Sequence, residues 1–299
     1  MSARSGWPMS VTDALRSAGI DPDELRALIR MALDEDLDGG VDVTTVATVP
    51  NHQRATLDLV ARAGGVSAGA PIAAAVFAEV CGDDADVTIV TPDGSRVEPG
   101  TVVVSVTGRT HDLLRAERPA LNLLGHLSGV ATATRRWVDA VDGTGARIRD
   151  TRKTTPGMRR LEKYAVRCGG GVNHRMSLSD AALVKDNHVV AAGGVAEAFD
   201  LVRSSFPGID VEVEVDSLDQ LDEVLAAGAD LVLLDNFTTD QMREAVRRNA
   251  GRARLEASGG LSIDVAADVA ATGVDYLAVG ALTHSAPVLD IGADLRQES

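Results

Sequence analysis

The stretch DVEVEVDSLDQLDEVLAAGADLVLLDN, residues 210–236, decides the fold because it has the pattern of a strand, a helix and a second strand. Each of its two β-like runs ends in a carboxylate, Glu214 in the first and Asp235 in the second. A near-continuous apolar run such as LVLL, residues 231–234, is typical of a parallel strand that is covered on both faces. The stretch therefore predicts consecutive βα units in a parallel sheet.

The same pattern recurs along the second half of the chain. Short β-like runs end near Asp150, Lys185, Glu214, Asp235, Ser258 and Gly280, with successive gaps of 35, 29, 21, 23 and 22 residues. Five of these six runs end in a charged or hydroxyl side chain. One such residue can simply mark where a strand leaves the core, but the strand ends of an α/β barrel meet on the face that carries chemistry. Five together indicate a site.

The first half of the chain predicts an α+β unit. We expect a loose tail over the first dozen residues, a helix that begins at Asp21-Pro22 and runs to about Leu37, and a later helix from Leu113 to about Val141. Between these helices, turn residues separate β-rich runs and one alanine-rich helical stretch, at residues 55–61, 101–106 and 70–80 respectively.

Composition excludes several classes of protein. The 299 residues suit one large domain or two ordinary ones, and 29 Lys and Arg against 44 Asp and Glu give a formal charge of −15, which argues against generic binding of nucleic acid or anionic membranes. Aromatic residues make up only 3%, too few for a base-stacking platform. The two cysteines, Cys81 and Cys168, indicate no disulfide framework, and the most apolar run, residues 70–78, is too short to span a bilayer. We therefore expect a cytoplasmic protein.

A basic segment stands out against this acidic background. Residues 147–175 contain nine Lys or Arg and two acids. A solvated helix face can account for four of the nine, namely Arg159, Arg160, Lys163 and Arg167. It does not account for Arg152-Lys153 after a strand end, or for His174-Arg175 after the glycines at 169–171. Because Arg and Lys side chains bind carboxylates and phosphates, the segment predicts a ligand with several negative charges.

Carboxylates and glycine turns complete the candidate site. Glu212 and Asp216 share the side of the strand that carries Glu214, and with Asp235 such a group can hold Mg²⁺, bind ribose hydroxyls or stabilise a cation; salt bridges are an equal alternative for Glu212 and Asp216. Turns after the last two strands have the character of phosphate-binding loops: Ser258, Gly259, Gly260 and Gly280, Ala281, Leu282. Of the other histidines, His52, His111 and His126 are expected to be structural, and His188 and His284 stay undecided.

Long motifs in this order resemble the quinolinate phosphoribosyltransferase family. They are ERPALNLLGHLSGVAT, RDTRKTTPGMRRLEKYAVRCGGGVNHR, ALVKDNH, EVEVDS, LVLLDNF, EASGGLS and GVDYLAVGALTHS. The resemblance extends from the helix near Asp21 to the C-terminus. It implies an N-terminal α/β sandwich over residues 1–120, with residues 289–299 packing on it, followed by an open, incomplete TIM-like α/β barrel over residues 121–288.

The resemblance also implies a reaction and an assembly. Phosphoribosyl pyrophosphate (PRPP) and quinolinate would give nicotinate mononucleotide, pyrophosphate and CO₂, with Mg²⁺, as a step of NAD biosynthesis. The implied homodimer closes each barrel with the partner's N-terminal domain, so that Arg118 is contributed in trans. The alternatives are a related phosphoribosyltransferase with another acceptor, a homologue associated with molybdate transport, or a barrel that binds a phosphorylated metabolite without catalysis.

By the same resemblance, each candidate residue receives a role. Arg118, Arg152, His174 and Arg175 would hold the two quinolinate carboxylates, with Thr151 beside them in the substrate site. Lys153 and Lys185 would bind pyrophosphate and substrate charge, while Glu214 and Asp235 would meet the ribose hydroxyls and the metal, directly or through PRPP and water. These last four form the expected catalytic set. The turns at 258–260 and 280–282 would take the 5′-phosphate.

Overall fold

A computed structural model describes residues 6–297, and its contacts divide the chain into two compact units. Unit 1 is formed by Met1–Ala133, Arg160–Gly169 and Ala286–Ser299, and unit 2 by Thr134–Arg159 and Gly170–Ser285. The division falls after Ala133 in the continuous helix α5 (Thr110–Ala140) rather than at the expected residue 120. Residues 121–133 of this helix, and the later segment 160–169, make their contacts within unit 1.

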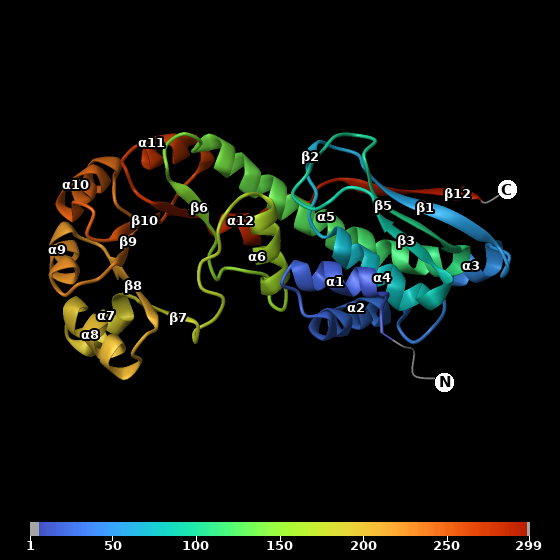
Figure 1. Cartoon of the computed structure of the whole chain (residues 1–299), viewed down its shortest axis with the longest axis horizontal. Coiled ribbons are helices and arrows are strands. Elements are labelled where there is room, and N and C mark those ends of the chain that lie inside the picture. Colours follow the sequence, from blue (N-terminus) through green and yellow to red (C-terminus); the bar gives the residue numbers. More distant parts are fainter. Residues whose placement is uncertain (1–5, 298–299) are drawn as a thin grey trace. The chain divides into compact units, whose positions relative to one another are not determined.

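Unit 1 contains a four-stranded antiparallel sheet with the order β12-β1-β5-β3. Its strands are β1 (Arg54–Ala61), β3 (Asp86–Ile89), β5 (Val102–Arg109) and β12 (Ile291–Gln297). Figure 1 shows β12, in red, beside β1, in blue, so the last segment of the chain completes the sheet of unit 1. A separate pair, β2 (Gly65–Val66) with β4 (Arg96–Val97), is also antiparallel.

The helices of unit 1 follow from their apolar patterns. Helix α4 (Ala70–Cys81) is apolar on nearly every side and is almost wholly buried. Helix α2 (Pro22–Leu37) begins where the Asp21 carboxylate accepts hydrogen bonds from the first-turn N–H groups. These two helices and the strands β1 and β5 confirm the predicted α+β unit. The short elements α3 and η1 comprise Val43–Thr48 and Gly82–Asp84.

Helix α1 (Met9–Ser17) shows that the predicted loose tail is wrong over these residues. Val11 and Leu15 lie one helical turn apart and are both buried, which holds the helix on unit 1. Its N-cap residue is Pro8, which provides no side-chain acceptor, so the usual helix-start signal is missing. Residues 1–5 of the predicted tail lie outside the described residues.

Helix α5 confirms the long helix expected from Leu113, but helix α6 (Arg159–Cys168) departs from its predicted role as a solvated face. Glu162 and Lys163 are fully buried, and Glu162 Oε1 lies 2.9 Å from Nε2 of His126 on α5. The helix is buried on this side because it packs within unit 1, and only its other side, with Arg160 and Arg167, is exposed.

Unit 2 is a six-stranded parallel sheet with the order β6-β11-β10-β9-β8-β7. In chain order its strands are Arg147–Arg149, Ala181–Val184, Asp210–Val215, Leu231–Asp235, Arg254–Ser258 and Tyr276–Ala278, labelled β6 to β11. The sheet is open, with β6 and β7 at its edges, as predicted for an incomplete barrel of six strands.

Helices alternate with the strands of unit 2, and α8, α9 and α10 lie along one side of the strands in Figure 1. The helical elements are α7 (Asp186–Ala192), α8 (Val195–Ser205), α9 (Leu218–Ala226), α10 (Thr239–Asn249), η2 (Ile263–Val265), α11 (Ala266–Ala270) and α12 (Ala281–His284). The apolar LVLL run forms the buried centre of β9, as a doubly covered strand requires. Among all helices of the described residues, none has the length and apolar character needed to cross a membrane.

Candidate active site

All but one of the candidate residues lie in unit 2, where most of them stand at or just after the C-terminal ends of strands, and His174 and Arg175 follow Val172, which bridges to Arg149 in β6. Because these strands are parallel, their ends lie along one edge of the sheet. The strand register pairs Asp235 with Ser258 and Ala278 with Arg149, which aligns neighbouring strand ends. The exception is Arg118, which lies on α5 within unit 1, with 61% of its side chain exposed and its guanidinium 3.9 Å from Glu117.

The turn at 280–282 lies against the residues that follow β6. A Cβ atom built on Gly280 would come within 2.9 Å of Cδ of Lys153 and 3.5 Å of Oγ1 of Thr151. The hydroxyl of Thr283, on α12, donates to the backbone oxygen of Lys153 at 2.8 Å. Thr151 and Lys153 are therefore placed beside Gly280, which the sequence alone did not predict.

Lys185 and Glu214 form an ion pair between the ends of β7 and β8. The Lys185 side chain is 44% exposed and the Glu214 side chain 15%, so both reach the open edge of the sheet. The backbone N–H of Lys185 donates to Nδ1 of His188 at 2.9 Å, which gives this histidine a structural role at the start of α7.

Asp235 and the glycine turn 258–260 are joined through Asn236. The Asn236 N–H donates to the Ser258 carbonyl at 2.9 Å, and its side-chain amide donates to Asp235 at 2.7 Å. Gly259 has a φ of +91°, and a Cβ atom there would lie 2.2 Å from Oδ1 of Asn236. Only glycine fits this turn without strain, and its backbone stays accessible to a ligand.

Arg152 and Arg175 form the cationic part of the site. The Nε atoms of both guanidinium groups are buried and have no hydrogen-bond partner among the described residues. Burial, followed by the positive charge of Arg152, lowers the pKa of Arg175 below its ordinary value. Two neighbouring guanidinium groups with unused N–H donors lack acceptors and negative charge, and an anionic ligand would supply both.

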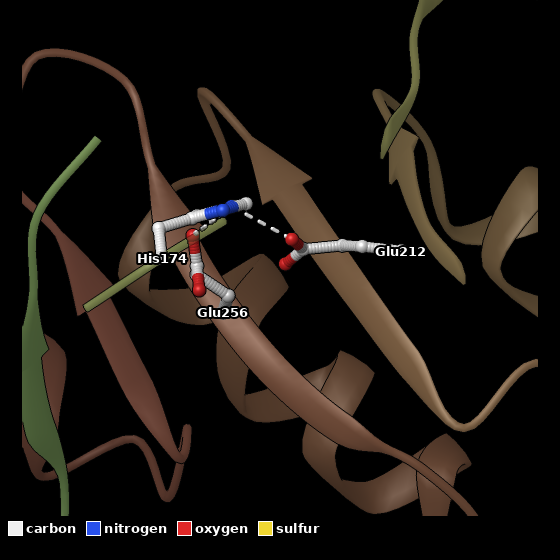
Figure 2. Close-up of side chains that lie close together, drawn as sticks. All are labelled: His174, Glu212 and Glu256. Atoms are coloured by element: carbon white, nitrogen blue, oxygen red, sulfur yellow. Dashed lines mark ion pairs between the residues drawn. The ribbon is translucent and has the colours of Figure 1, made fainter. Parts of the chain in front are cut away.

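A buried cluster of charges lies behind these arginines, and Figure 2 shows three of its members. His174 Nε2 is 2.7 Å from Oε2 of Glu212 and 3.6 Å from Oε1 of Glu256. Arg149 Nη1 lies 2.5 Å from Glu256 and 3.7 Å from Glu212. The salt-bridge interpretation therefore holds for Glu212, whereas Asp216 is exposed.

Sequence reasoning missed Arg149 and Glu256 as members of this cluster. Glu256 is fully buried, and burial together with the charge of Glu212 raises its pKa to about 8. The one available signal was a glutamate inside the otherwise apolar part of β10, because an acid is rarely buried there without a partner.

Two groups of side chains can be tested against a divalent cation. Glu214 and Asp235 offer carboxylate oxygens beside open solvent, which suits Mg²⁺ because this ion keeps several water ligands. His174, Glu212 and Glu256 place ligand atoms within 4.8 Å of one another, but all three are buried, which leaves no access for the water ligands that Mg²⁺ keeps. The donor sets therefore favour Glu214 and Asp235.

Both halves of the chain match models of one family. The N-terminal domain of "Quinolinate phosphoribosyl transferase" matches residues 42–128, and its C-terminal domain matches residues 130–294. The two matches together span residues 42–294 apart from residue 129, and so include most of both units.

Individual relatives agree with the family match. A nicotinate-nucleotide pyrophosphorylase [carboxylating] of Mycobacterium leprae is 54% identical over 91% of this chain and 98% of its own length. A probable enzyme of that name from Bacillus subtilis is 38% identical, over 91% and 93%. The crystal structure of NadC from Streptococcus pyogenes aligns with a TM-score of 0.89 at 38% identity, over 94% of this chain and 99% of that one. The chain therefore belongs to the quinolinate phosphoribosyltransferase family.

Proposed function

We infer that this chain transfers the phosphoribosyl group of PRPP to quinolinate and releases pyrophosphate and CO₂, which yields nicotinate mononucleotide for NAD biosynthesis. Family membership supports the reaction. The structural observation that supports it most is that Arg152 and Arg175 lie close enough for the charge of one to lower the pKa of the other. Quinolinate has two adjacent carboxylates, and two guanidinium groups with unused buried donors match that demand.

Binding of the acceptor needs the cations of the site. Arg152 and Arg175 bind the carboxylates of quinolinate, together with the partner subunit's Arg118 in a homodimer. The exposure of Arg118 and its position on α5, in unit 1, support a role toward a second copy of the chain. Thr151 belongs to the same substrate site, and His174 directly precedes Arg175 there.

Transfer requires groups that stabilise charge at the sugar. Departure of pyrophosphate from the anomeric carbon gives that carbon oxocarbenium character, which the carboxylates of Glu214 and Asp235 stabilise. Lys153 and Lys185 bind the leaving pyrophosphate, and the turns at 258–260 and 280–282 bind the 5′-phosphate through backbone N–H groups. Mg²⁺, when bound near Glu214 and Asp235, supplies further positive charge to the pyrophosphate oxygens.

The last step needs no protein nucleophile. The pyridine nitrogen of quinolinate forms the bond to the anomeric carbon as the bond to pyrophosphate breaks. The resulting ring cation accepts the electron pair that remains when the adjacent carboxylate leaves as CO₂, and the ring carbon then takes up a proton. The chain's part is to hold both substrates in position and to exclude water.

The release of labelled CO₂ from carboxyl-labelled quinolinate, measured with and without PRPP, tests this function. We expect release that requires both PRPP and Mg²⁺. A barrel that only binds a phosphorylated metabolite would release none, and an enzyme with another acceptor would release none from this substrate. Either result would reject the proposal.

Two substitutions separate the acceptor site from the sugar site. Arg175→Ala should raise the KM for quinolinate at least about 100-fold, because a charge-assisted contact is lost. Glu214→Ala should mainly lower kcat, by about 100-fold or more, because its charge acts in the transition state. Arg160→Ala, which removes an exposed cation paired with Glu24 in unit 1, is the control and should change neither constant. Unchanged kinetics in both site variants would refute the assignment.

A further inference from the structure

The segment Asn173-His174-Arg175 is fixed by buried contacts although it follows a run of glycines. Its preceding residue, Val172, forms a parallel β-bridge with Arg149 at the edge of the sheet. The fully buried carboxylate of Asp150 then accepts hydrogen bonds from the Asn173 side chain at 2.5 Å and from the His174 N–H at 2.8 Å. The backbone of the segment is thus tied to the end of β6.

The imidazole ring of His174 uses both of its nitrogens inside the protein. Nδ1 accepts a hydrogen bond from the backbone N–H of Arg175 at 2.7 Å. An accepting Nδ1 carries no proton, so the proton is on Nε2, which lies 2.7 Å from Glu212 (Figure 2). With only 8% of the residue exposed, the ring has one orientation, and that orientation fixes the N–H of Arg175.

Glu212 is suited to hold this ring because it lies on a rigid element. It projects from the middle of β8, only 2% exposed, and the side chains of its ion-pair partners His174 and Arg149 are only 8% and 15% exposed. Arg149 lies 3.7 Å from the carboxylate of Glu212 and compensates its charge, and it also lies 2.5 Å from Glu256. The buried carboxylate of Glu212 therefore lies against His174, and His174 directly precedes Arg175, which we assign to quinolinate binding.

We propose that Glu212 is a positioning residue for quinolinate binding: its Oε2 lies 2.7 Å from Nε2 of His174, and this buried contact holds the ring and so keeps Arg175 in line with Arg152. This inference rests on the proposed function. Among the described residues, Arg175 has a second anchor in the hydrogen bond from its Nη1 to the Ala181 carbonyl at 3.0 Å, which restrains the side chain, so loss of the His174 contact leaves its backbone less restrained. The carboxylate of Glu212 itself does not touch the substrate.

The test measures quinolinate binding by calorimetry without PRPP, which separates binding from turnover. Glu212→Ala should raise the dissociation constant about tenfold, because His174 loses its 2.7 Å contact with a buried carboxylate. The Glu212→Gln side chain has the same shape and keeps an oxygen at this position. Its dissociation constant for quinolinate should lie within about threefold of that of the unmodified chain. Asp210→Ala is the matched control, because this acid is exposed at the start of the same strand.

Two further measurements distinguish positioning from a general loss of stability. In an Arg175→Ala background, Glu212→Ala should cause no additional loss of affinity, because the effect passes through Arg175. In the unmodified chain with ¹⁵N-labelled histidine, NMR should show His174 with a proton on Nε2 and none on Nδ1, and the Nε2 chemical shift should change in Glu212→Ala.

Each contrary result overturns the inference. These results are unchanged affinity in Glu212→Ala, a Glu212→Gln variant as impaired as Glu212→Ala, effects of Glu212 and Arg175 that add in full, or a proton on Nδ1 of His174. Failure of the unmodified chain both to bind quinolinate and to release CO₂ would instead reject the proposed function. The inference about Glu212 alone fails if that chain binds and reacts normally and any of the four results is found.

Discussion

Replacement of Glu256 by glutamine should make the chain more stable at alkaline pH, although it removes a group that lies 2.5 Å from Arg149. Burial, together with the nearby charge of Glu212, raises the pKa of Glu256 from 4.5 to about 8. The folded chain therefore keeps a proton on this carboxyl that the unfolded chain has already released. This contribution to stability is fully present below about pH 4.5 and is lost as the pH rises to about 8.

The magnitude follows from the separation of the two pKa values. They differ by about 3.5, and each pH unit between them is worth about 1.4 kcal/mol, so the free energy of unfolding should fall by about 5 kcal/mol across this interval. Glutamine has the shape of the protonated acid and does not ionise. The Glu256→Gln variant should therefore match the unmodified chain near pH 4.5 and exceed it by up to about 5 kcal/mol above pH 8.

Urea denaturation followed by tryptophan fluorescence provides the measurement. The chain has two tryptophans, Trp7 and Trp137, and a Trp7→Phe background leaves Trp137 to report on unit 2, where Glu256 lies. The opposite sign would refute the reasoning. If the ionised pair with Arg149 dominates, Glu256→Gln would instead be less stable by about 3–5 kcal/mol at neutral pH, the cost of leaving a buried charge without its partner.

Three other substitutions or treatments have outcomes that the structure specifies. Gly129→Ala should lower the free energy of unfolding by about 3 kcal/mol in denaturant titrations, because its Cβ would lie 2.1 Å from the Pro287 carbonyl oxygen; an unchanged midpoint would contradict this packing. Gly259→Ala should raise the KM for PRPP about tenfold through strain at a φ of +91°. Gly260→Ala should have the smaller effect, because the space around its Cβ is open. Equal effects of the two substitutions on this KM would contradict the argument. Burial raises the pKa of both thiols, Cys81 and Cys168, from 9.0 to about 12. Iodoacetamide near pH 8 should therefore alkylate the folded chain about 1,000-fold more slowly than the urea-unfolded chain. Fast labelling of the folded chain would disprove this protection of the thiols.

Most of the fold was accessible from local sequence patterns. The six parallel strands, α2, α4 and α5 each have an apolar period or a start signal within one short window, and all were predicted. Helix α1 was missed because its only signals are the Val11 and Leu15 pair over nine residues, without a capping side chain. The burial of Lys163 was missed because its helix packs in unit 1, among residues far away in the sequence.

The candidate site, too, has one part that the sequence predicts and another that it does not. Strand ends show which residues reach the edge of the sheet, so Glu214, Asp235 and Lys185 could be selected from the sequence, and the Lys185 pair with Glu214 then appears between neighbouring strands. The buried cluster could not be selected, because Arg149 and Glu256 come from strands 107 residues apart and are joined only by the strand order of the sheet. A buried charge is defined by its partners, and partners distant in sequence leave no local pattern.

The pairing of β12 with β1 has a consequence for how the protein is made. Because β12 is the final strand of the chain, the edge of β1 exposes its N–H and C=O groups throughout the synthesis of unit 2. A nascent chain that stalls before Ile291 therefore keeps an open edge that can recruit the same strand from a neighbouring polypeptide. Correct folding of unit 1 therefore depends on synthesis through β12, because β1 is made early and its partner strand is made only after unit 2.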